Sequence, residues 1–472
     1  MTSIILNTKK PLPLWQALLP LIVLLIALFF NIRHVGDAAQ DGSNQMILIT
    51  CGLIAAALGW FRGVHWQDMM VSVERNIAST SQAIIILLLI GALAGSWMAG
   101  GIVPAMIYYG TALMHPTYFL PVSAIICAIV ALVTGSSWST TATIGIALMA
   151  MSEPLGIPIY ITAGAIISGA YFGDKLSPLS DTTNLAAAMG NVDVIKHIKY
   201  LSITTIPTFI IALVIYLVIS LFYGSDASTS LEMREKLPNI YNLNPWIFLA
   251  PVATIVLIAR KVPAIPALSF GIFAGIACMV IFQRESLVGT GLYNAIHDAL
   301  LTQYQPLTSN KDMEELLSTG GMAGMLNTIW LILAAMFFGG IMEACGFLKR
   351  MTRALISEKS SDVATVAATA GSAITVNVSA SDQYLAIVIP GRMFAGSFAE
   401  RNLSPENMTR TLEDAGTVTS PLIPWNTCGA YQSTILGVNA FVYAPFAFFN
   451  ILSPLMSILF MKLNIKIQRI KA

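Results

Sequence analysis

Charged residues are scarce in this sequence. Only 10% of its 472 residues are Asp, Glu, Lys or Arg, whereas 56% are hydrophobic and the mean hydropathy is +0.74. A soluble domain carries about 25% charged residues, so these charges could not cover the surface of a soluble fold of this size. The formal net charge of +1 provides no cationic surface, and we therefore expect no nucleic acid partner.

The sequence also lacks the motifs of metal, haem and covalent chemistry. Its five cysteines are scattered through apolar stretches and form no CxxC pair and no Cys/His spacing. No nucleophile stands in a recognisable arrangement with a base. We therefore expect no enzyme activity and no cofactor apart from transported ions. The cysteines should pack as small apolar residues.

Long apolar segments are abundant. A membrane-spanning helix needs roughly 20 apolar residues, so the chain has room for about twelve membrane segments. We predict an all-α polytopic membrane protein that forms one integral membrane domain over residues 1–472, with the lipid bilayer as its partner. The clearest predicted spans are 14–31, 46–61, 84–104, 119–134, 157–172, 201–223, 245–260, 263–283, 326–346, 383–399 and 443–462. Segments near 136–151, 364–378 and 429–442 fit either re-entrant hairpins or short spans.

Lysine and arginine positions predict the orientation of the chain. Short loops rich in these residues face the cytoplasm. This rule places both termini in the cytoplasm and the loop 224–244 outside. The cytoplasmic positions are Lys9, Lys10, Arg62, Arg75, Lys196, Lys199, Arg260, Lys261, Lys349, Arg350, Arg353 and the tail from Lys462 to Lys471.

Three short blocks recur at nearly one offset, which indicates an internal repeat. Because the span from 84 runs outward in this orientation and its counterpart from 326 runs inward, the repeat is inverted. We predict a first repeat over 84–223 and a second over 326–462, with broken helices, re-entrant hairpins and a substrate site near the midplane. The matching blocks are Gly173–Leu179 with Gly416–Leu422 at an offset of 243, Gly95 and Gly101 with Gly340 and Gly346 at 245, and Ser137 and Ser139 with Ser379 and Ser381 at 242.

Three polar clusters interrupt the apolar segments. The first is the run 177–184, which follows Asp174 and Lys175 and contains a Ser-Pro pair typical of a helix start. Since an apolar helix precedes it, the helix must break, and a break frees backbone carbonyls. Carbonyl, hydroxyl and carboxylate oxygens are the ligands that hard cations prefer.

The second cluster precedes the first in the same half of the chain, and the third is the repeat partner of the first. The second, 134–141, is rich in hydroxyl groups, which also suits tight helix packing. Its repeat partner around 377–383 adds a carboxylate and amides. The third, 420–427, has two prolines three residues apart, which a regular helix cannot contain. Ion or proton coupling residues are therefore predicted to be Asp174, Asp181 and Asp382, and substrate-binding residues Ser137, Ser177, Thr182, Asn184, Asn377, Ser420 and Asn426.

Other charged residues have plainer interpretations. Glu413 and Asp414 lead into the third cluster, and we expect them to be interfacial. Lys175 offers its neighbour Asp174 a structural salt bridge. Asp181 follows a helix break, and its repeat partner position holds Pro424, so the scaffold does not require a carboxylate there. Asp181 is therefore the preferred coupling residue, and Asp174 is its main rival.

At these clusters the sequence resembles the NhaC family of sodium/proton antiporters. The motifs that carry the resemblance are Thr134-Gly135-Ser136-Ser137-Trp138, Gly173–Ala186, Asp382–Ala386 through Pro390–Phe394, and Gly416–Asn426. They extend over most of the chain from about 84 to 440. The resemblance implies an ion transporter of the inner membrane, built from two inverted repeats, that exchanges cytoplasmic sodium for external protons. Some members of the family exchange organic acids, such as malate against lactate.

Two functions therefore stay open. In the leading hypothesis Asp174 and Asp181 hold Na⁺ and H⁺ alternately, and Asp181, Thr182 and Asn184 are Na⁺ ligands. In the alternative, the chain couples Na⁺ or H⁺ to transport of a small organic acid or amino acid, because helix N-termini at the two Ser-Pro pairs would attract a carboxylate. Na⁺ and H⁺ are the expected transported partners, and a homodimer is left open.

Overall fold

The computed structural model describes residues 12–35, 41–223, 228–284, 291–306, 308, 313–314, 317–355 and 361–470. Within these residues the secondary structure is helical, and the β-pairing consists of two isolated bridges. Eight helices are long and apolar enough to cross a membrane, or up to ten if each of two bent helix pairs is one span. The all-α polytopic membrane fold is thereby confirmed. Fewer full spans exist than the roughly twelve predicted segments because several segments are short or broken.

The long apolar helices account for most of the bundle. They are α1 (Leu14–Val35), α2 (Ser43–Trp60), α3 (Trp66–Ala99), α5 (Pro116–Thr134), α10 (Val194–Ser220), α13 (Ala264–Phe282), α16 (Leu326–Ala344, preceded by η5, Ala323–Met325) and α18 (Asp362–Ala380). The bent pairs join α11 (Ser228–Ile240) to η3 (Pro245–Phe248) and α12 (Leu249–Ala259), and α22 (Ala440–Tyr443) with η8 (Ala444–Phe446) to α23 (Phe448–Lys462).

Shorter helices fill the interior and the ends of the bundle. They are α4 (Ile102–Leu113), α6 (Ser137–Thr140), η2 (Thr141–Gly145), α7 (Ile146–Ser152), α8 (Ile159–Lys175), α9 (Asp181–Met189), α14 (Leu292–Leu301), α17 (Phe347–Ala354), α19 (Gln383–Glu400), α20 (Pro405–Leu412), η6 (Glu413–Thr417), η7 (Ser420–Leu422) and α21 (Thr427–Leu436). Helix α11 occupies most of the predicted loop 224–244, whose residues 224–227 lie outside the described part of the chain.

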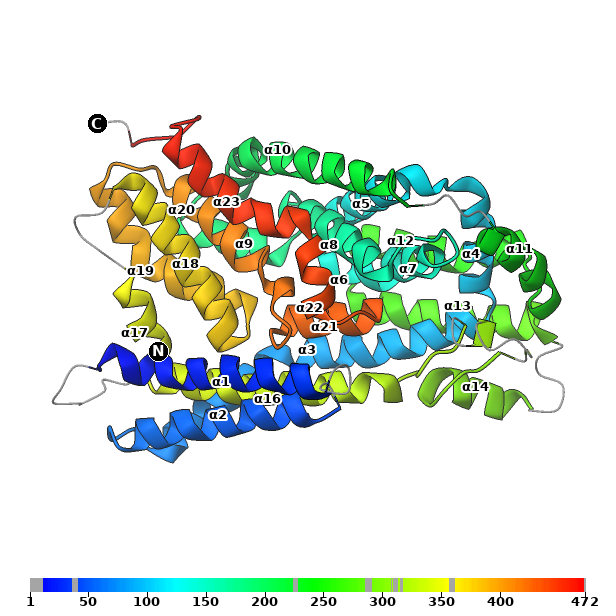
Figure 1. Cartoon of the computed structure of the whole chain (residues 1–472), viewed down its shortest axis with the longest axis horizontal. Coiled ribbons are helices and arrows are strands. Elements are labelled where there is room, and N and C mark those ends of the chain that lie inside the picture. The colour runs from blue at the N-terminus through cyan, green and yellow to red at the C-terminus, as the bar shows by residue number, and fades with distance from the viewer. Residues whose placement is uncertain are drawn as a thin grey trace.

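The helices form two groups along the long axis of the molecule. Figure 1 shows α1, α2, α3 and α16 running together on one side, and α5, α8, α10 and α23 on the other. Small residues bring helices close in the second group. A Cβ atom on Gly169 or Gly173 would lie 2.1 Å from a backbone oxygen of α5, so α8 can approach α5 this closely only with glycine at both positions.

The predicted span 84–104 has different boundaries in the structure. Helix α3 begins already at Trp66 and ends at Ala99, and α4 begins after Gly101. Gly101 has a φ of 76°, a left-handed conformation that ends one helix and lets the next begin at a new angle. Gly346, between α16 and α17, has a φ of 72°, and the residues before the two glycines have identical angles, φ −74° and ψ −4°.

A second break also recurs in the two halves of the chain. Gly135 (φ 68°, ψ 28°) followed by the extended residue Ser136 matches Ser381 (φ 61°, ψ 23°) followed by the extended Asp382. These pairs are 246 residues apart, whereas the serine match predicted 242. The helix breaks thus recur at nearly the offset expected of a repeat; the inverted relation of 84–223 to 326–462 stays a prediction.

Candidate functional site

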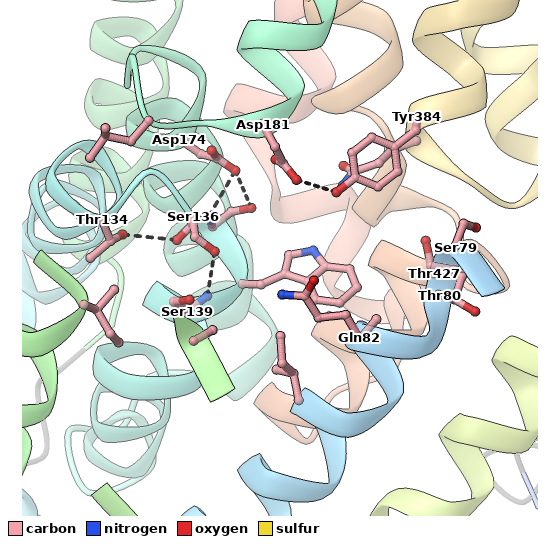
Figure 2. Close-up of a pocket in the computed structure, with 18 of the residues that line it drawn as sticks. Ser79, Thr80, Gln82, Thr134, Ser136, Ser139, Asp174, Asp181, Tyr384 and Thr427 are labelled. Atoms are coloured by element: carbon pink, nitrogen blue, oxygen red, sulfur yellow. Dashed lines mark hydrogen bonds between the residues drawn. The ribbon is translucent and has the colours of Figure 1, made fainter. Parts of the chain in front are cut away.

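Helix breaks from both halves of the chain surround one cavity of about 420 Å³. Each of four helix breaks contributes to its wall, either directly or through an adjacent residue. The breaks are 135–136, 176–180, 381–382 and 423–426. The polar side chains in the wall include Ser79, Thr80, Gln82, Thr134, Ser136, Ser137, Ser139, Asp174, Asp181, Lys261, Asp382, Gln383, Tyr384 and Thr427. Figure 2 shows Asp174 and Ser136 on one side of the cavity and Thr80 and Thr427 on the other.

Local sequence explains why two of these helices restart at the cavity. After the left-handed residue Gly135, the Ser136 side chain accepts a hydrogen bond from the Ser139 N–H at 3.1 Å. After Ser381, Asp382 accepts one from the Leu385 N–H at 2.8 Å. Both are helix N-caps, which satisfy backbone donors that a helix start leaves free. The positive ends of α6 and α19 therefore begin at the cavity wall.

The other two breaks use the same device. Ser180 accepts a hydrogen bond from the Thr183 N–H at 3.4 Å and caps α9. Asn426 accepts one from the Cys428 N–H at 3.0 Å and caps α21. Four helix starts consequently gather around this region, two from each half of the chain.

Asp174 is the predicted coupling residue that the fold holds most firmly at the cavity. It lies one residue before the end of α8 and is only 6% exposed. Its Oδ2 accepts hydrogen bonds from the Ser137 N–H at 3.0 Å and from the Ser137 hydroxyl at 2.8 Å (Figure 2). Its Oδ1 has no hydrogen-bond partner in the described part of the chain. A buried carboxylate oxygen without a partner is available to a cation or a proton.

Asp181 and Asp382 also line the cavity, in different surroundings. Asp181 is exposed; it accepts hydrogen bonds from the Thr182 N–H at 2.8 Å and from the Tyr384 hydroxyl at 2.5 Å (Figure 2). Asp382 is 5% exposed and caps α19. The structure therefore brings all three predicted coupling carboxylates to one cavity, with Ser137 among them.

The remaining predicted residues of the first half do not face this cavity. The Thr182 hydroxyl donates to Glu413 at 3.2 Å, and Ser177 accepts a hydrogen bond from the Leu179 N–H at 3.3 Å. The Asn184 side chain donates to the Pro178 carbonyl at 3.0 Å and to the Ser180 carbonyl at 2.6 Å. Asn184 thus satisfies the carbonyls of the helix break itself.

Asn377, Ser420 and Asn426 form a buried network behind the cavity. Asn426 donates to the carbonyl and side-chain oxygens of Asn377, both at 3.1 Å. Asn377 in turn donates to the Gly416 carbonyl at 2.5 Å. The Ser420 hydroxyl donates to the Thr417 carbonyl at 2.6 Å. The bonds of Asn377 and Asn426 join α18 to η6 and to the start of α21. They also satisfy buried carbonyl groups near the helix breaks.

Two expectations about charged residues prove wrong. Lys175 makes its salt bridge with Asp414, 239 residues later, and not with the adjacent Asp174. Neighbouring residues on a helix point in different directions and cannot pair readily. Glu413 and Asp414 are not interfacial: both are fully buried. Asp414 also accepts hydrogen bonds from Ser453 at 2.5 Å and from Ser457.

Several cavity residues were not predicted. Ser79, Thr80 and Gln82 lie on α3, and Lys261 lies at the end of α12 with a φ of 65°. The polar run 79–82 stands directly before the long apolar part of α3 and was a usable signal in the sequence. Lys261 gave none, because a lysine at a span end normally marks only orientation.

The described residues contain no group of three or more His, Cys, Asp or Glu side chains that could hold a metal ion. The cavity supplies carboxylate and hydroxyl oxygens together with helix starts. That combination suits a monovalent cation or a small anion.

A protein-family comparison matches residues 169–465 to the "Na+/H+ antiporter family". This range includes Asp174 and Asp382. It also includes three of the four helix starts at the cavity, those of α9, α19 and α21. The matched part alone covers more than half of the chain.

Several named relatives match about nine tenths of the chain. The Na⁺/H⁺ antiporter NhaC of Alkalihalophilus pseudofirmus is 37% identical over 423 residues, which cover 89% of this chain and 90% of the relative. A malate-2H⁺/Na⁺-lactate antiporter of Bacillus subtilis is 34% identical, with 90% of each chain covered. The arginine/ornithine antiporter ArcD of Halobacterium salinarum is 35% identical over 94% of this chain and 90% of its own.

Proposed function

The chain belongs to the Na⁺/H⁺ antiporter family, with NhaC proteins among its relatives, and on that basis we propose that it exchanges cytoplasmic Na⁺ for external H⁺. The resemblance to NhaC that the sequence motifs indicated is confirmed. The protein is a multi-pass membrane protein of a transporter family. Its placement in the inner membrane with both termini in the cytoplasm is part of the proposal.

The single observation that supports exchange most directly is the geometry of Asp174. Its carboxylate is buried at the cavity wall, is held by two hydrogen bonds from Ser137 and keeps one oxygen without a partner. Such a group can bind Na⁺ or H⁺, but not both at once. Competition for one carboxylate is sufficient to couple the two ions in opposite directions.

Asp174 is a better candidate for this role than Asp181. Both oxygens of Asp181 already accept hydrogen bonds, one from Thr182 and one from Tyr384, and the residue is exposed. Water already stabilises the ionised form of an exposed carboxylate, so a bound cation adds little further stabilisation. Asp181 would then act at the exposed end of the path, while Asp174 holds the ion.

The cavity wall is consistent with access from the cytoplasm. Lys261, at the junction of α12 and α13, is one of the residues whose position predicts a cytoplasmic loop, and it lines the cavity. Release on the other side would require one group of helices to move against the other, as in other transporters with repeated halves.

Transport of a small organic anion is the second candidate. A cavity of about 420 Å³ is far larger than a sodium ion, and Lys261 and several helix starts could hold a carboxylate. Two relatives are named for organic solutes, one as a malate-2H⁺/Na⁺-lactate antiporter and one as an arginine/ornithine antiporter.

Purified protein in vesicles that contain a pH-sensitive dye separates these functions. A Na⁺ gradient alone is expected to move protons. Vesicles without protein, and a K⁺ gradient of equal size, serve as controls. A dye signal that requires added malate, lactate or an amino acid would contradict Na⁺/H⁺ exchange and establish the second function.

A further inference from the structure

A buried group of oxygen atoms lies behind the cavity, between the α8–α9 break and the π-helical turn η6. Glu413 begins this turn and is fully buried. Its Oε1 accepts a hydrogen bond from the Thr182 hydroxyl at 3.2 Å, and its Oε2 has no hydrogen-bond partner in the described residues. Isolated π turns inside helices are frequent at functional sites.

Neighbouring oxygens are also left without hydrogen bonds. The buried Thr417 hydroxyl lies beside the Glu413 carboxylate, and the Ser180 hydroxyl lies beside the Asp174 carboxylate. Within the described residues, neither the Thr417 hydroxyl nor the Oδ1 of Asp174 has a partner at ordinary hydrogen-bond geometry. Ser180 in turn lies 3.1 Å from the Thr182 hydroxyl. A buried acceptor without a partner costs roughly 1–3 kcal/mol, and more if it is charged. Three such atoms in one place are explained most simply by a ligand that all of them contact.

The charges of this region favour a cation as that ligand. Asp414 is fully engaged by Lys175, Ser453 and Ser457, so the Lys175 charge is already paired. No salt bridge to Glu413 or Asp174 occurs within the described part of the chain. Three buried carboxylates, Asp174, Glu413 and Asp414, therefore lie around the single ammonium group of Lys175, and their charges exceed its charge.

The backbone of the turn is fixed independently of Glu413. Asn377 donates to the Gly416 carbonyl, and Lys175 joins the turn to the end of α8 through Asp414. The side chains of Glu413 and Thr417 are thus presented on a rigid element opposite Asp174. Because the side chains are already ordered, binding a cation there requires little further loss of conformational entropy.

We propose that Glu413 and Asp174 together bind the transported Na⁺, with the hydroxyls of Ser180, Thr182 and Thr417 completing the set of ligands. This inference rests on the proposed exchange of Na⁺ for H⁺ and adds Glu413 and Thr417 to its site. The site contains only carboxylate and hydroxyl oxygens, which hard cations prefer. The cavity is then the route by which the ion reaches Asp174, and Glu413 is the ligand on the buried side.

Direct Na⁺ binding by the purified protein tests the site without relying on transport. Thermal unfolding is measured in detergent over a series of NaCl concentrations, with choline chloride keeping the ionic strength constant. A ligand that binds only the folded state raises Tm in proportion to its binding. Wild type is expected to show a saturable rise in Tm with Na⁺, which Glu413→Gln abolishes and Thr417→Val shifts to about tenfold higher Na⁺. The control is Glu153→Gln, which removes an exposed carboxylate that does not line the cavity and should respond to Na⁺ like wild type.

The outcomes distinguish this inference from the proposed function. If Glu413→Gln and Thr417→Val respond to Na⁺ like wild type, Glu413 is a neutral structural acid and the site is wrong. If Glu413→Gln does not fold, Thr417→Val alone decides, because valine has nearly the shape of threonine. If wild-type vesicles fail to exchange Na⁺ for H⁺, the proposed function fails; if they exchange while both variants bind Na⁺ normally, only this site fails.

Discussion

Replacing Asp414 by asparagine should destabilise the folded protein far more than a typical loss of an ion pair. Asp414 and Lys175 are 1% and 0% exposed, and they join η6 to the end of α8. The asparagine side chain keeps the shape; its Oδ1 can accept a hydrogen bond from one of Ser453 and Ser457, and its amide N–H can donate to the hydroxyl of the other. What is lost is the negative charge beside a buried ammonium group.

The expected magnitude follows from this burial. Removing one partner of a buried ion pair costs about 3–5 kcal/mol, because the other charge is left without compensation. The exposed pair of Asp362 and Arg469, at 30% and 50% exposure, is the matched control. Asp362→Asn should cost about 1 kcal/mol or less, since solvent screens exposed pairs. If both members of the buried pair become neutral, in Lys175→Met with Asp414→Asn, most of the loss should be recovered.

Resistance to unfolding by heat or by a denaturing detergent, read from the fraction of protein that stays monodisperse, measures these differences. The order expected is wild type, Asp362→Asn, the double variant and, well below them, Asp414→Asn. If Asp414→Asn is no less stable than Asp362→Asn, Lys175 does not depend on Asp414. The same result would follow if Lys175 paired with Asp174, as its position in the sequence suggests.

Four further predictions concern the ion path, the packing and the orientation. Asp174→Asn should abolish Na⁺-driven proton movement in vesicles, whereas Asp181→Asn should keep a measurable part; equal loss in both would contradict the assignment of Asp174. Ser137→Ala removes one of two hydrogen bonds to Asp174 and should raise KM for Na⁺ at least about tenfold, since a hydrogen bond to a charged group contributes roughly 1.5–3 kcal/mol; an unchanged KM would count against it. Gly173→Ala should lower the folded yield, because its Cβ would lie 2.1 Å from the Ala128 carbonyl oxygen, while Gly396→Ala, with open space around it, should not. Cysteine introduced at the exposed Asn239 should react with a membrane-impermeant reagent in intact cells; labelling only after permeabilisation would reverse the predicted orientation.

Features that depend on neighbours in sequence could be predicted. Apolar runs identified the membrane class, because a bilayer requires a minimum length of apolar helix. Ser-Pro at 177–178 marked a helix break, since proline and capping residues act through local geometry. Gly101 and Gly346 were matched only as parts of a repeat, and the structure shows that each lies at a helix break with a left-handed backbone. Asp174, Asp181 and Asp382 stood out because a carboxylate in an apolar segment is expensive.

Features that depend on residues far apart in the sequence could not be predicted. Lys175 stands next to Asp174, yet its partner is Asp414 on η6. Asn184 looked like an ion ligand, but its amide satisfies the carbonyls of Pro178 and Ser180. The sequence by itself therefore determined the membrane class, the helix breaks and the residue types at them. Which polar groups face one another, and which oxygens stay free, only the tertiary structure decided, because helix packing sets the direction of each side chain.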